Sequence, residues 1–377
     1  MRILYVAQKH DYGKPERGLS FEHWNFSDTL GRIGHELLYF DLGRLLDPGK
    51  RAALNQRLLE IVRSEKPDLM FTVLYENELD KNIVRRISFE TDTTTFNWFA
   101  DDHWRFESFS RHWAPCFNWV STTAGSALPK YGRLGYRNVI KTQWGCNHYL
   151  YRKLDVPLKY DVSFVGQPHG NRRAVIEALR GAGLNVATFG GGWDGGRISQ
   201  EQMIEVFNSS RINLNLSNAS MVPPTPARRV ASAFLRHVPG AMAAWRRIRK
   251  RTPKGAGANA SLPVASPSDQ IKGRNFEVPG CGGFLLTGLA DNLTSYFEPG
   301  CEIACFGTLD ELLATARRYL HDDEQRTRVA GAGYERTLSQ HTYVHRFTEI
   351  FEHIGLRCEP SSAVMNRAGK TPTVQEI

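Results

Sequence analysis

The sequence lacks long apolar runs and paired cysteines. No stretch approaches the roughly 18 consecutive apolar residues that a membrane-spanning helix needs. The amino-terminal run Met1 to Ala7 is followed at once by polar residues, which does not fit a signal peptide. The six cysteines are scattered without a CxxC pair, so we expect reduced thiols and neither a disulfide framework nor a structural zinc site. We therefore predict a cytoplasmic protein.

Acidic residues are missing from one stretch in the second half of the chain. Residues 228–254 hold nine basic residues and no acidic one, and the formal net charge of the whole chain is 48 − 39 = +9. The remainder of the chain therefore balances to zero, which indicates a basic patch and not a basic domain. Apolar residues, Trp245 among them, are interspersed with the arginines.

A helix formed by this basic segment would have an apolar strip with cationic flanks, which suits three different roles. It could lie on an anionic lipid surface with its Trp at the interface, as a peripheral contact at the inner face of the membrane. It could instead bind nucleic acid or an acidic polymer, or form an uninvolved solvated flap. We expect no nucleic-acid partner.

The composition is that of an ordinary globular protein, and the chain is long enough for two domains. Of the 377 residues, 41% are hydrophobic, and short β-rich runs alternate with longer amphipathic segments. This alternation is typical of a parallel sheet covered by crossover helices. The first unit has strand candidates at 3–7, 37–40, 69–74, 95–99 and 119–122, with helices at 21–33 and 51–64.

A second α/β unit begins near Tyr160. Its strand candidates are 161–166, 185–189, 212–216 and 284–287, and its helix candidates are 172–179, 200–209, 275–280 and 309–320. Pro-, Gly- and Ser-rich stretches flank the basic segment and mark linkers. The tail after Leu356 has few large apolar residues and is predicted to be disordered.

The segment from Gln270 to Thr287, QIKGRNFEVPGCGGFLLT, is the most specific in the chain. It resembles the nucleotide-sugar motif of the group 1 glycosyltransferases, in the branch typified by the CgeB spore-maturation proteins. The likeness continues through Tyr296-Phe297-Glu298-Pro299-Gly300 and ends at His341-Thr342-Tyr343-Val344-His345-Arg346, which is similar to that family's HTYxHR signature. It covers roughly residues 160 to 350 well and the amino-terminal half loosely.

The resemblance implies the GT-B architecture, in which two Rossmann-like domains face each other across a cleft. It implies a hexosyltransferase-type glycosyltransferase that moves a sugar from a nucleotide-diphosphate donor to a glycan, lipid-linked or protein acceptor, with the donor as co-substrate and no separate cofactor. The resulting boundaries are an acceptor domain at 1–158, a donor domain at 159–340 with a basic insert at 223–268, a helix crossing back to the first domain at 341–356, and a disordered tail at 357–377.

Two residues of the motif are the first candidates for donor binding. The Glu277 carboxylate can accept hydrogen bonds from ribose hydroxyls. Arg274 offers a fork that fits phosphate oxygens, and the resemblance places it near the diphosphate. The alternative is an ordinary i,i+3 ion pair between the two. The family usually has a glutamate seven residues before Glu277, where this chain has Gln270, so the sugar contact and the stereochemical outcome stay open.

Further donor candidates lie at the ends of predicted strands. Gly166 ends a strand whose following turn could receive an anion on free N–H groups, with Arg172 or Arg173 adding charge. The glycine could equally be needed only for the turn. Gly192 could bring backbone close to a base or close a loop, and Asn215 faces either the donor sugar or solvent.

The candidates for a catalytic base all follow strands of the first unit. Asp102 comes after the strand 95–99, where open α/β sheets place ligands, and it is our preferred base. His10 and Asp11 follow the first strand and compete for this role, as does Glu76 after the third. Each could instead cap a helix. Asp101-Asp102 is not a spaced DxD pair, so we predict no catalytic metal.

Two rival functions stay open. One is a nucleotide-sugar epimerase or hydrolase of the same architecture. The other is a non-catalytic protein that uses its basic segment to bind nucleic acid or a membrane surface. Turnover of a donor without any acceptor would indicate the first, and binding without turnover the second.

Overall fold

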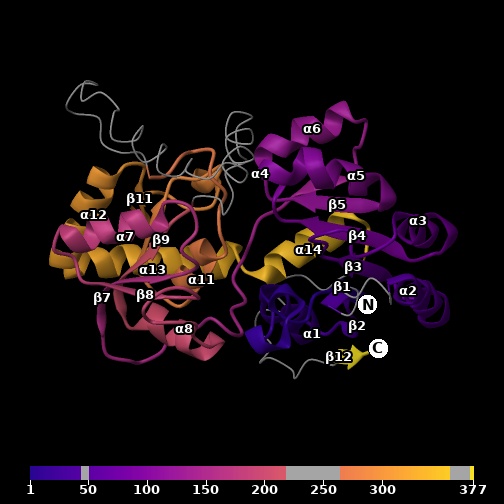
Figure 1. Cartoon of the computed structure of the whole chain (residues 1–377), viewed down its shortest axis with the longest axis horizontal. Helices are drawn as coiled ribbons and strands as arrows, with labels where there is room; N and C mark the ends of the chain where they lie inside the picture. The colour runs from indigo at the N-terminus through magenta and orange to yellow at the C-terminus, as the bar shows by residue number, and fades with distance from the viewer. Residues whose placement is uncertain (44–50, 218–263, 357–373) are drawn as a thin grey trace, which may run out of the picture.

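Two parallel sheets with helices around them form the protein and lie side by side (Figure 1). This computed structural model describes residues 1–43, 51–217, 264–356 and 374–377. The basic segment 228–254 and most of the predicted insert and tail lie outside the described residues. The arrangement confirms the predicted α/β fold with two Rossmann-like domains.

The first domain is built on a seven-stranded parallel sheet in the order β12-β2-β1-β3-β4-β5-β6. Its strands are β1 (Arg2–Ala7), β2 (Glu36–Asp41), β3 (Leu69–Thr72), β4 (Thr94–Phe99), β5 (Trp119–Thr122), β6 (Val139–Lys141) and β12 (Val374–Glu376). The central strands are buried along almost their whole length, as parallel strands between two helical layers are. All five predicted strands are present.

Two of the helical segments of the first domain lie in the predicted ranges 21–33 and 51–64, and the other helices had no predicted range. They are α1 (Asp28–Arg32), α2 (Arg51–Glu65), α3 (Lys81–Glu90), α4 (Asp102–Arg105), α5 (Arg111–Trp113) and α6 (Leu128–Arg133). A π-helical stretch, His23–Ser27, directly precedes α1. Within the described ranges, none of the helices is both long and apolar enough to cross a membrane.

The end of the chain corrects one prediction. Of the tail 357–377, predicted to be disordered, the structure describes only residues 374–377, and β12 there pairs in parallel with β2, with Val374 opposite Leu37 and Glu376 opposite Tyr39. Backbone pairing compensates for the shortage of large apolar side chains in this strand.

The second domain has a five-stranded parallel sheet in the order β11-β10-β9-β7-β8. Its strands are β7 (Tyr160–Val165), β8 (Val186–Phe189), β9 (Ser210–Asn215), β10 (Leu285–Gly288) and β11 (Ala304–Phe306). Its helices are α7 (Arg172–Gly181), α8 (Gln200–Asn208), α11 (Arg274–Gly280), α12 (Leu309–His321) and α13 (Asp323–Gln340). Reciprocal side-chain caps fix the starts of α8 and α12.

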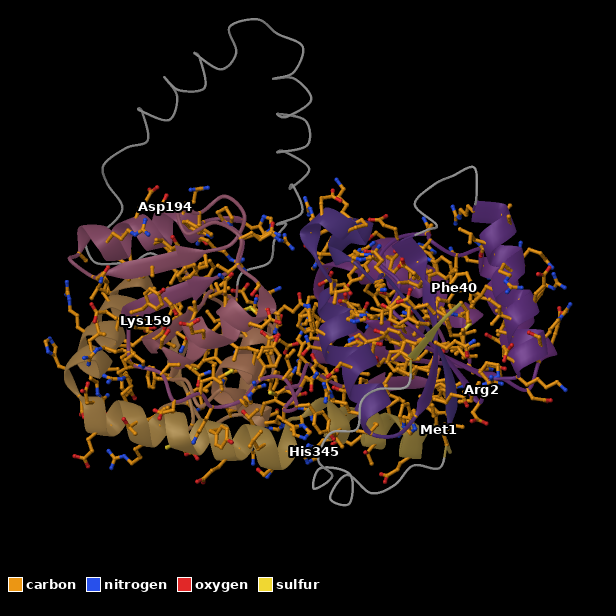
Figure 2. All side chains as sticks on the ribbon, turned by 90° about the horizontal axis from the view of Figure 1, so that it is seen from below. Met1, Arg2, Phe40, Lys159, Asp194 and His345 are labelled. Atoms are coloured by element: carbon orange, nitrogen blue, oxygen red, sulfur yellow. The ribbon has the colours of Figure 1, made fainter. Side chains whose placement is uncertain are left out.

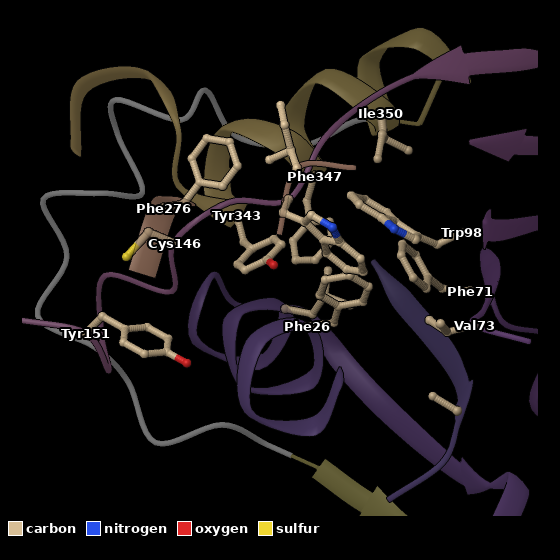
Figure 3. Packing of buried hydrophobic residues seen from close by; sticks show 14 of the residues in the cluster. Phe26, Phe71, Val73, Trp98, Cys146, Tyr151, Phe276, Tyr343, Phe347 and Ile350 are labelled. Atoms are coloured by element: carbon tan, nitrogen blue, oxygen red, sulfur yellow. The ribbon is translucent and has the colours of Figure 1, made fainter. Parts of the chain in front are cut away.

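The last helix, α14 (Tyr343–His353), follows the second domain in the chain but packs in the first (Figures 1 and 3). The Phe347 ring lies 5.6 Å from that of Phe26 and 5.8 Å from that of Phe71, centroid to centroid. One apolar cluster therefore continues from the first domain through the junction to Phe276 of the second. In Figure 2, side chains of both domains meet along this junction.

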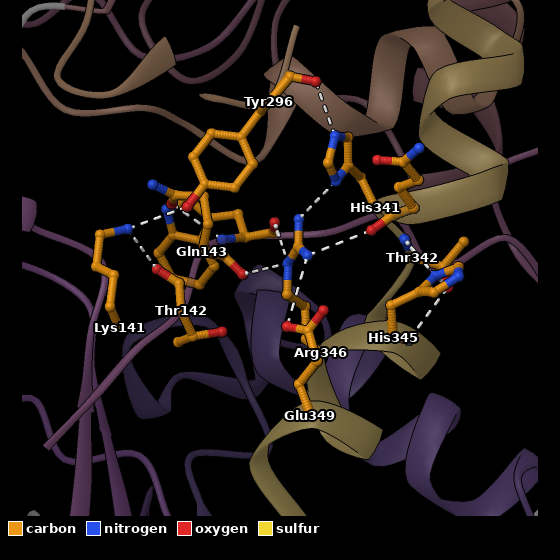
Figure 4. Close-up of polar contacts among 11 residues, drawn as sticks. Lys141, Thr142, Gln143, Tyr296, His341, Thr342, His345, Arg346 and Glu349 are labelled. Atoms are coloured by element: carbon orange, nitrogen blue, oxygen red, sulfur yellow. Dashed lines mark hydrogen bonds and ion pairs between the residues drawn. The ribbon is translucent and has the colours of Figure 1, made fainter. Parts of the chain in front are cut away.

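A buried polar network fixes the start of α14 (Figure 4). The Arg346 Nε donates to the carbonyls of Gln143 and Trp144, at 3.2 and 3.3 Å, and its Nη2 lies 3.1 Å from His341 Nδ1. Burial lowers the pKa of His341 to about 3, so the neutral ring accepts from Arg346 and donates through Nε2 to the Tyr296 carbonyl at 2.7 Å. The HTYxHR residues thus hold the two domains together.

Candidate functional site

A cavity of about 340 Å³ lies between the carboxyl ends of the two sheets. In each sheet the strand order reverses beside the first strand, between β1 and β3 and between β7 and β9. Tyr12 and Tyr75, after β1 and β3, line the cavity together with Gly166 and Asn215, at the ends of β7 and β9. Open α/β sheets bind ligands at such reversal points, so both domains present their binding edges to one space.

A second cavity of about 370 Å³ adjoins the first and shares Phe21, Gly166 and Arg274 with it. Asp11 of the first domain and Arg197 of the second line this second cavity and form an ion pair at 2.6 Å. The two cavities together are called the cleft below. The cleft is thus bridged by a contact between the domains.

A cavity of about 750 Å³ lies away from the cleft, between α2 and α3. Its polar side chains already have partners within the fold. Arg51 donates to the Leu79 carbonyl at 2.7 Å, and Trp113 donates to Asn77 at 3.1 Å. Volume alone therefore does not mark the functional site.

Three cations of the second domain line the 340 Å³ cavity: Arg172, Lys272 and Arg274. Arg172 is fixed by bonds from its guanidinium to the carbonyls of Gln167 and Leu216, at 3.0 and 2.9 Å. Burial, with the charge of Arg274, lowers the pKa of Arg172 to about 10. Burial likewise lowers the pKa of Lys272, and Arg172 contributes to this. Cations held against one another out of water are suited to binding an anion with several oxygens.

Gln270 joins the two domains at this cavity. Its Nε2 donates to the Ala100 carbonyl of the first domain at 2.5 Å, and its Oε1 accepts from Lys272 Nζ at 3.1 Å. A glutamate could not donate to a carbonyl at neutral pH, because an ionised carboxylate only accepts. The amide at this position therefore has a bridging role that the usual glutamate could not fill.

The Glu277 side chain does not face the cleft, contrary to the sequence-based prediction. Its side chain is 0% exposed and lines neither cavity of the cleft. One carboxylate oxygen accepts from the Tyr151 hydroxyl at 2.8 Å, and the other forms an ion pair with Arg274. The structure shows the i,i+3 pair that was the alternative, and the ribose contact of Glu277 stays a prediction. The carboxylate is turned inward because α11 is buried from Asn275 to Gly280.

The other donor candidates divide into two groups. Gly166 and Asn215 line the 340 Å³ cavity. Arg173 and Gly192 line neither cavity, because the Arg173 guanidinium donates to the Gly192 carbonyl and lies over the Trp193 ring, 5.0 Å from its centroid. The structure therefore does not bring Arg173 and Gly192 into the cleft.

The side chain of Asp102, the preferred base, also lies outside the cleft, contrary to the sequence-based prediction. It is 0% exposed, accepts from the Tyr131 hydroxyl at 2.8 Å and lines neither cavity. Burial raises the pKa of this carboxyl. Its neighbour Asp101 faces the cavity instead. The side chain of Asp102, the first residue of α4, thus points into the domain, and that of Asp101 points toward the cavity.

The competing bases are placed as follows. Asp11 lines the 370 Å³ cavity in its pair with Arg197. His10 lines neither cavity, and Glu76 is exposed outside both. Only Asp11 among these three reaches the cleft.

Sequence reasoning missed several residues of the 340 Å³ cavity, among them Lys272, Glu22 and Tyr75. Lys272 stands inside the motif, two residues before Arg274, so a signal for it was present. Glu22 and Tyr75 gave no signal, since Glu22 lies in a segment with helical periodicity and Tyr75 in a loop. The described residues contain no group of three or more His, Cys, Asp or Glu placed to hold a metal ion. Metal-free chemistry stays a prediction.

Comparison with known proteins finds a family model that matches part of the second half of the chain. Residues 172–250 and 256–352 match the model of a glycosyl transferase-like family. No curated protein sequence matches the chain. The CgeB branch stays a prediction.

Solved structures with the same fold cover nearly the whole chain. HepE from Anabaena in complex with UDP-glucose is 13% identical, with a TM-score of 0.59, over 94% of this chain and 99% of its own. Sucrose-phosphate synthase from Thermosynechococcus elongatus is 8% identical, with a TM-score of 0.61 and the same coverage. The apo form of the lipopolysaccharide outer core galactosyltransferase WaaB is 11% identical, with a TM-score of 0.51. The chain therefore has the GT-B fold, and residues 172–250 and 256–352 of its second half are similar to the glycosyl transferase-like family model.

Proposed function

We propose that the protein is a glycosyltransferase that moves a sugar from a nucleotide-diphosphate donor to an acceptor hydroxyl. The observation that carries the proposal is the composition of the 340 Å³ cavity. The second domain contributes Arg172, Lys272 and Arg274, and the first domain contributes the carboxyl groups of Glu22 and Asp101. A donor held between them would have its diphosphate at the cations and its sugar facing the first domain.

In the proposed reaction, the acceptor oxygen forms a bond with the anomeric carbon while the bond from that carbon to the diphosphate oxygen breaks. The electron pair of the broken bond stays on the diphosphate. Cations that are already fixed in place stabilise this developing negative charge without having to reorganise. Such a site thereby lowers the activation barrier of the transfer. The bridges Gln270 to Ala100 and Arg197 to Asp11 hold the domains close, which limits access of water to the sugar.

Two findings support this reaction class. The second half of the chain matches a glycosyl transferase-like family, and HepE, with the same fold, has been crystallised with UDP and with UDP-glucose. We propose a hexosyl donor, a glycan, lipid-linked or protein acceptor, no separate cofactor and a cytoplasmic site of action. The peripheral membrane contact assigned to 228–254 concerns residues outside those described.

The proposal is tested by thermal unfolding with UDP-, GDP- and dTDP-sugars. A ligand that binds only the folded state stabilises it by about 2.7 kcal/mol at 100 times its Kd, so the matching donor should raise the Tm. The same donor is then incubated alone and with candidate acceptors. Release of nucleotide diphosphate that depends on acceptor supports transfer, and epimerised donor without acceptor supports the rival enzyme. Failure of every nucleotide and nucleotide sugar to bind would refute the proposal.

The variant Asp102→Asn tests whether a carboxyl group buried outside the cleft is needed for transfer. Because Asp102 is buried outside the cleft, we expect transfer within about twofold of wild type, together with a loss of about 1 kcal/mol in the free energy of unfolding from the altered bond to Tyr131. Urea unfolding and initial rates measure the two effects. A large loss of transfer in a stably folded Asp102→Asn protein would return Asp102 to the site.

A further inference from the structure

Tyr12, in the loop after β1, places an exposed aromatic side chain at the cleft. It lines the 340 Å³ cavity and is 60% exposed. Three other large apolar side chains are exposed among the described residues, and they line neither cavity of the cleft: Phe89, Leu134 and Leu158. Binding pockets combine aromatic rings with a few polar groups, and Tyr12 supplies an accessible ring to a cavity that is otherwise rich in charge.

The backbone of Tyr12 is held in the left-handed region, with φ 54° and ψ 31°. This conformation is costly for a residue with a large side chain and persists only where the surroundings fix it. Here the loop is closed on itself, since the Asp11 N–H donates to the Gly18 carbonyl at 3.0 Å and the Gly13 N–H to the His10 carbonyl at 2.8 Å. A glycine or an asparagine would make the same turn with less strain, so the turn does not account for the tyrosine.

Two arginines fix the loop and the ring. Arg197 of the second domain donates to the Asp11 carboxylate at 2.6 Å and to the Arg17 carbonyl at 2.7 Å, so it holds the loop on both sides of Tyr12. The Arg17 guanidinium lies over the Tyr12 ring, 5.0 Å from its centroid. The side chain nevertheless stays 60% exposed, and much of the ring is therefore accessible in a position that is fixed before any ligand binds.

The groups around Tyr12 match a sugar ring better than an acyl chain. A sugar ring has an apolar face of C–H bonds, which packs on the electron-rich face of an aromatic ring, and hydroxyl groups at its edge, which donate to carboxylates. Glu22 and Asp101 line the same cavity and supply carboxylate oxygens. An acyl chain needs a continuous apolar surface, whereas Tyr12 is the one exposed large apolar side chain that the described residues place at the cleft.

The position of Tyr12 favours the acceptor over the donor as the ligand of the ring. The cations suited to the diphosphate, Arg172, Lys272 and Arg274, belong to the second domain, and Tyr12 belongs to the first. The transferred sugar has to be shielded from water, which a side chain that is 60% exposed does not do. The acceptor enters from solvent and extends back into it, so it is the ligand that meets an exposed ring.

We propose that the part of the acceptor that enters the cleft is a sugar ring and that this ring packs on Tyr12. The inference rests on the proposed function and narrows its acceptor to a glycan, whether free or attached to a carrier. In this assignment Tyr12 is a specificity-determining residue that touches the acceptor. Arg17 and Arg197 are positioning residues, because they act through the ring and through its loop.

Tyr12→Asn tests the contact, since it removes the ring and keeps a residue that tolerates the left-handed backbone. The donor identified by thermal unfolding is combined with a panel of methyl hexosides and short oligosaccharides as acceptors. We expect the wild type to transfer to at least one of them, and Tyr12→Asn to raise the KM for that acceptor about tenfold, with kcat within about threefold. The Kd for the donor in calorimetry should be unchanged, and Tyr12→Phe, which restores the ring, should recover most of the lost affinity.

Phe89→Ala is the matched control for the loss of an exposed ring. Phe89, on α3 of the same domain, is 64% exposed and lines neither cavity of the cleft, so its removal should leave the acceptor KM and the donor Kd at their wild-type values. Urea unfolding of Tyr12→Asn should give a free energy equal to or above that of the wild type, because asparagine relieves the backbone strain. A raised KM then reports lost binding and not a damaged fold.

The possible outcomes separate the inference from the proposed function. An unchanged acceptor KM in Tyr12→Asn would overturn the role of Tyr12, and so would a weaker donor Kd measured without acceptor, which would place the ring on the donor. A wild type that transfers to none of the glycosides, whether or not it transfers to a serine-containing peptide or to polyprenyl phosphate, would overturn the sugar ring as acceptor. A wild type that binds no nucleotide sugar would overturn the proposed function itself, and the inference with it.

Discussion

Replacing Lys272 with alanine is expected to lower kcat/KM for transfer by about 10²- to 10³-fold and to leave the fold intact. A fixed donor aimed at developing negative charge contributes an effect of this size in other enzymes. Within the protein, Lys272 donates to Gln270 alone among the described hydrogen bonds of its side chain, at 3.1 Å, so its remaining donors are available to a ligand.

The same substitution should not destabilise the ligand-free protein. Burial lowers the pKa of Lys272, Asp101 and Asp269 oppose this effect, and Arg172 adds to it, so the ligand-free fold disfavours the charge chiefly because it is buried. Its removal relieves the cost of burying this charge and also removes its attraction to Asp101, and we expect the free energy of unfolding in urea to stay close to that of wild type. Such an exchange of stability against function is common at binding sites.

Lys159→Ala is the control for the Lys272 experiment. Lys159 forms an exposed ion pair with Glu205 at 2.5 Å, and Figure 2 places it on the second domain away from the junction. Exposed pairs contribute little, so its loss should change neither rate nor stability by a measurable amount. Equal losses of activity in the two variants would indicate a general effect of charge and contradict the assignment of Lys272.

The sequence predicts the two sheets well because their strands are buried on both faces and appear as short continuous apolar runs. It does not predict β6, β11 or β12, since a three-residue strand has too few positions to show a pattern. The pairing of β12 with β2 also joins segments that are more than 300 residues apart. No local signal specifies such a contact.

In the candidate site, too, local sequence patterns predict some residues, and others depend on contacts between residues far apart in the chain. The motif includes Lys272 and Arg274, both of which line the cleft. The pattern Asp101-Asp102 places two carboxylates after a strand but does not say which one faces the ligand. The partner of Glu277, Tyr151, lies 126 residues earlier in the chain, and only the fold shows that it closes the carboxylate off from the cleft.

The ion pair between Arg274 and Glu277 is expected to be asymmetric in its contribution to stability. The Arg274 side chain keeps 26% of its surface exposed at the cleft, while that of Glu277 keeps 0%. Arg274→Ala leaves a buried carboxylate without its cation and should lower the free energy of unfolding by about 3–5 kcal/mol. Glu277→Ala leaves a cation that can turn toward water in the cleft, and we expect a smaller loss of about 1–3 kcal/mol.

A double variant, Arg274→Met with Glu277→Leu, separates the structural part of this pair from its part in binding. Replacing both charges by apolar side chains of similar volume removes the desolvation penalty along with the attraction, so urea unfolding should show most of the lost stability restored. Donor affinity should stay low in calorimetry, because Arg274 is the member that lines the cleft. If the double variant binds donor as wild type does, the pair serves only the fold. If Glu277→Ala costs as much stability as Arg274→Ala, the burial asymmetry does not govern the pair.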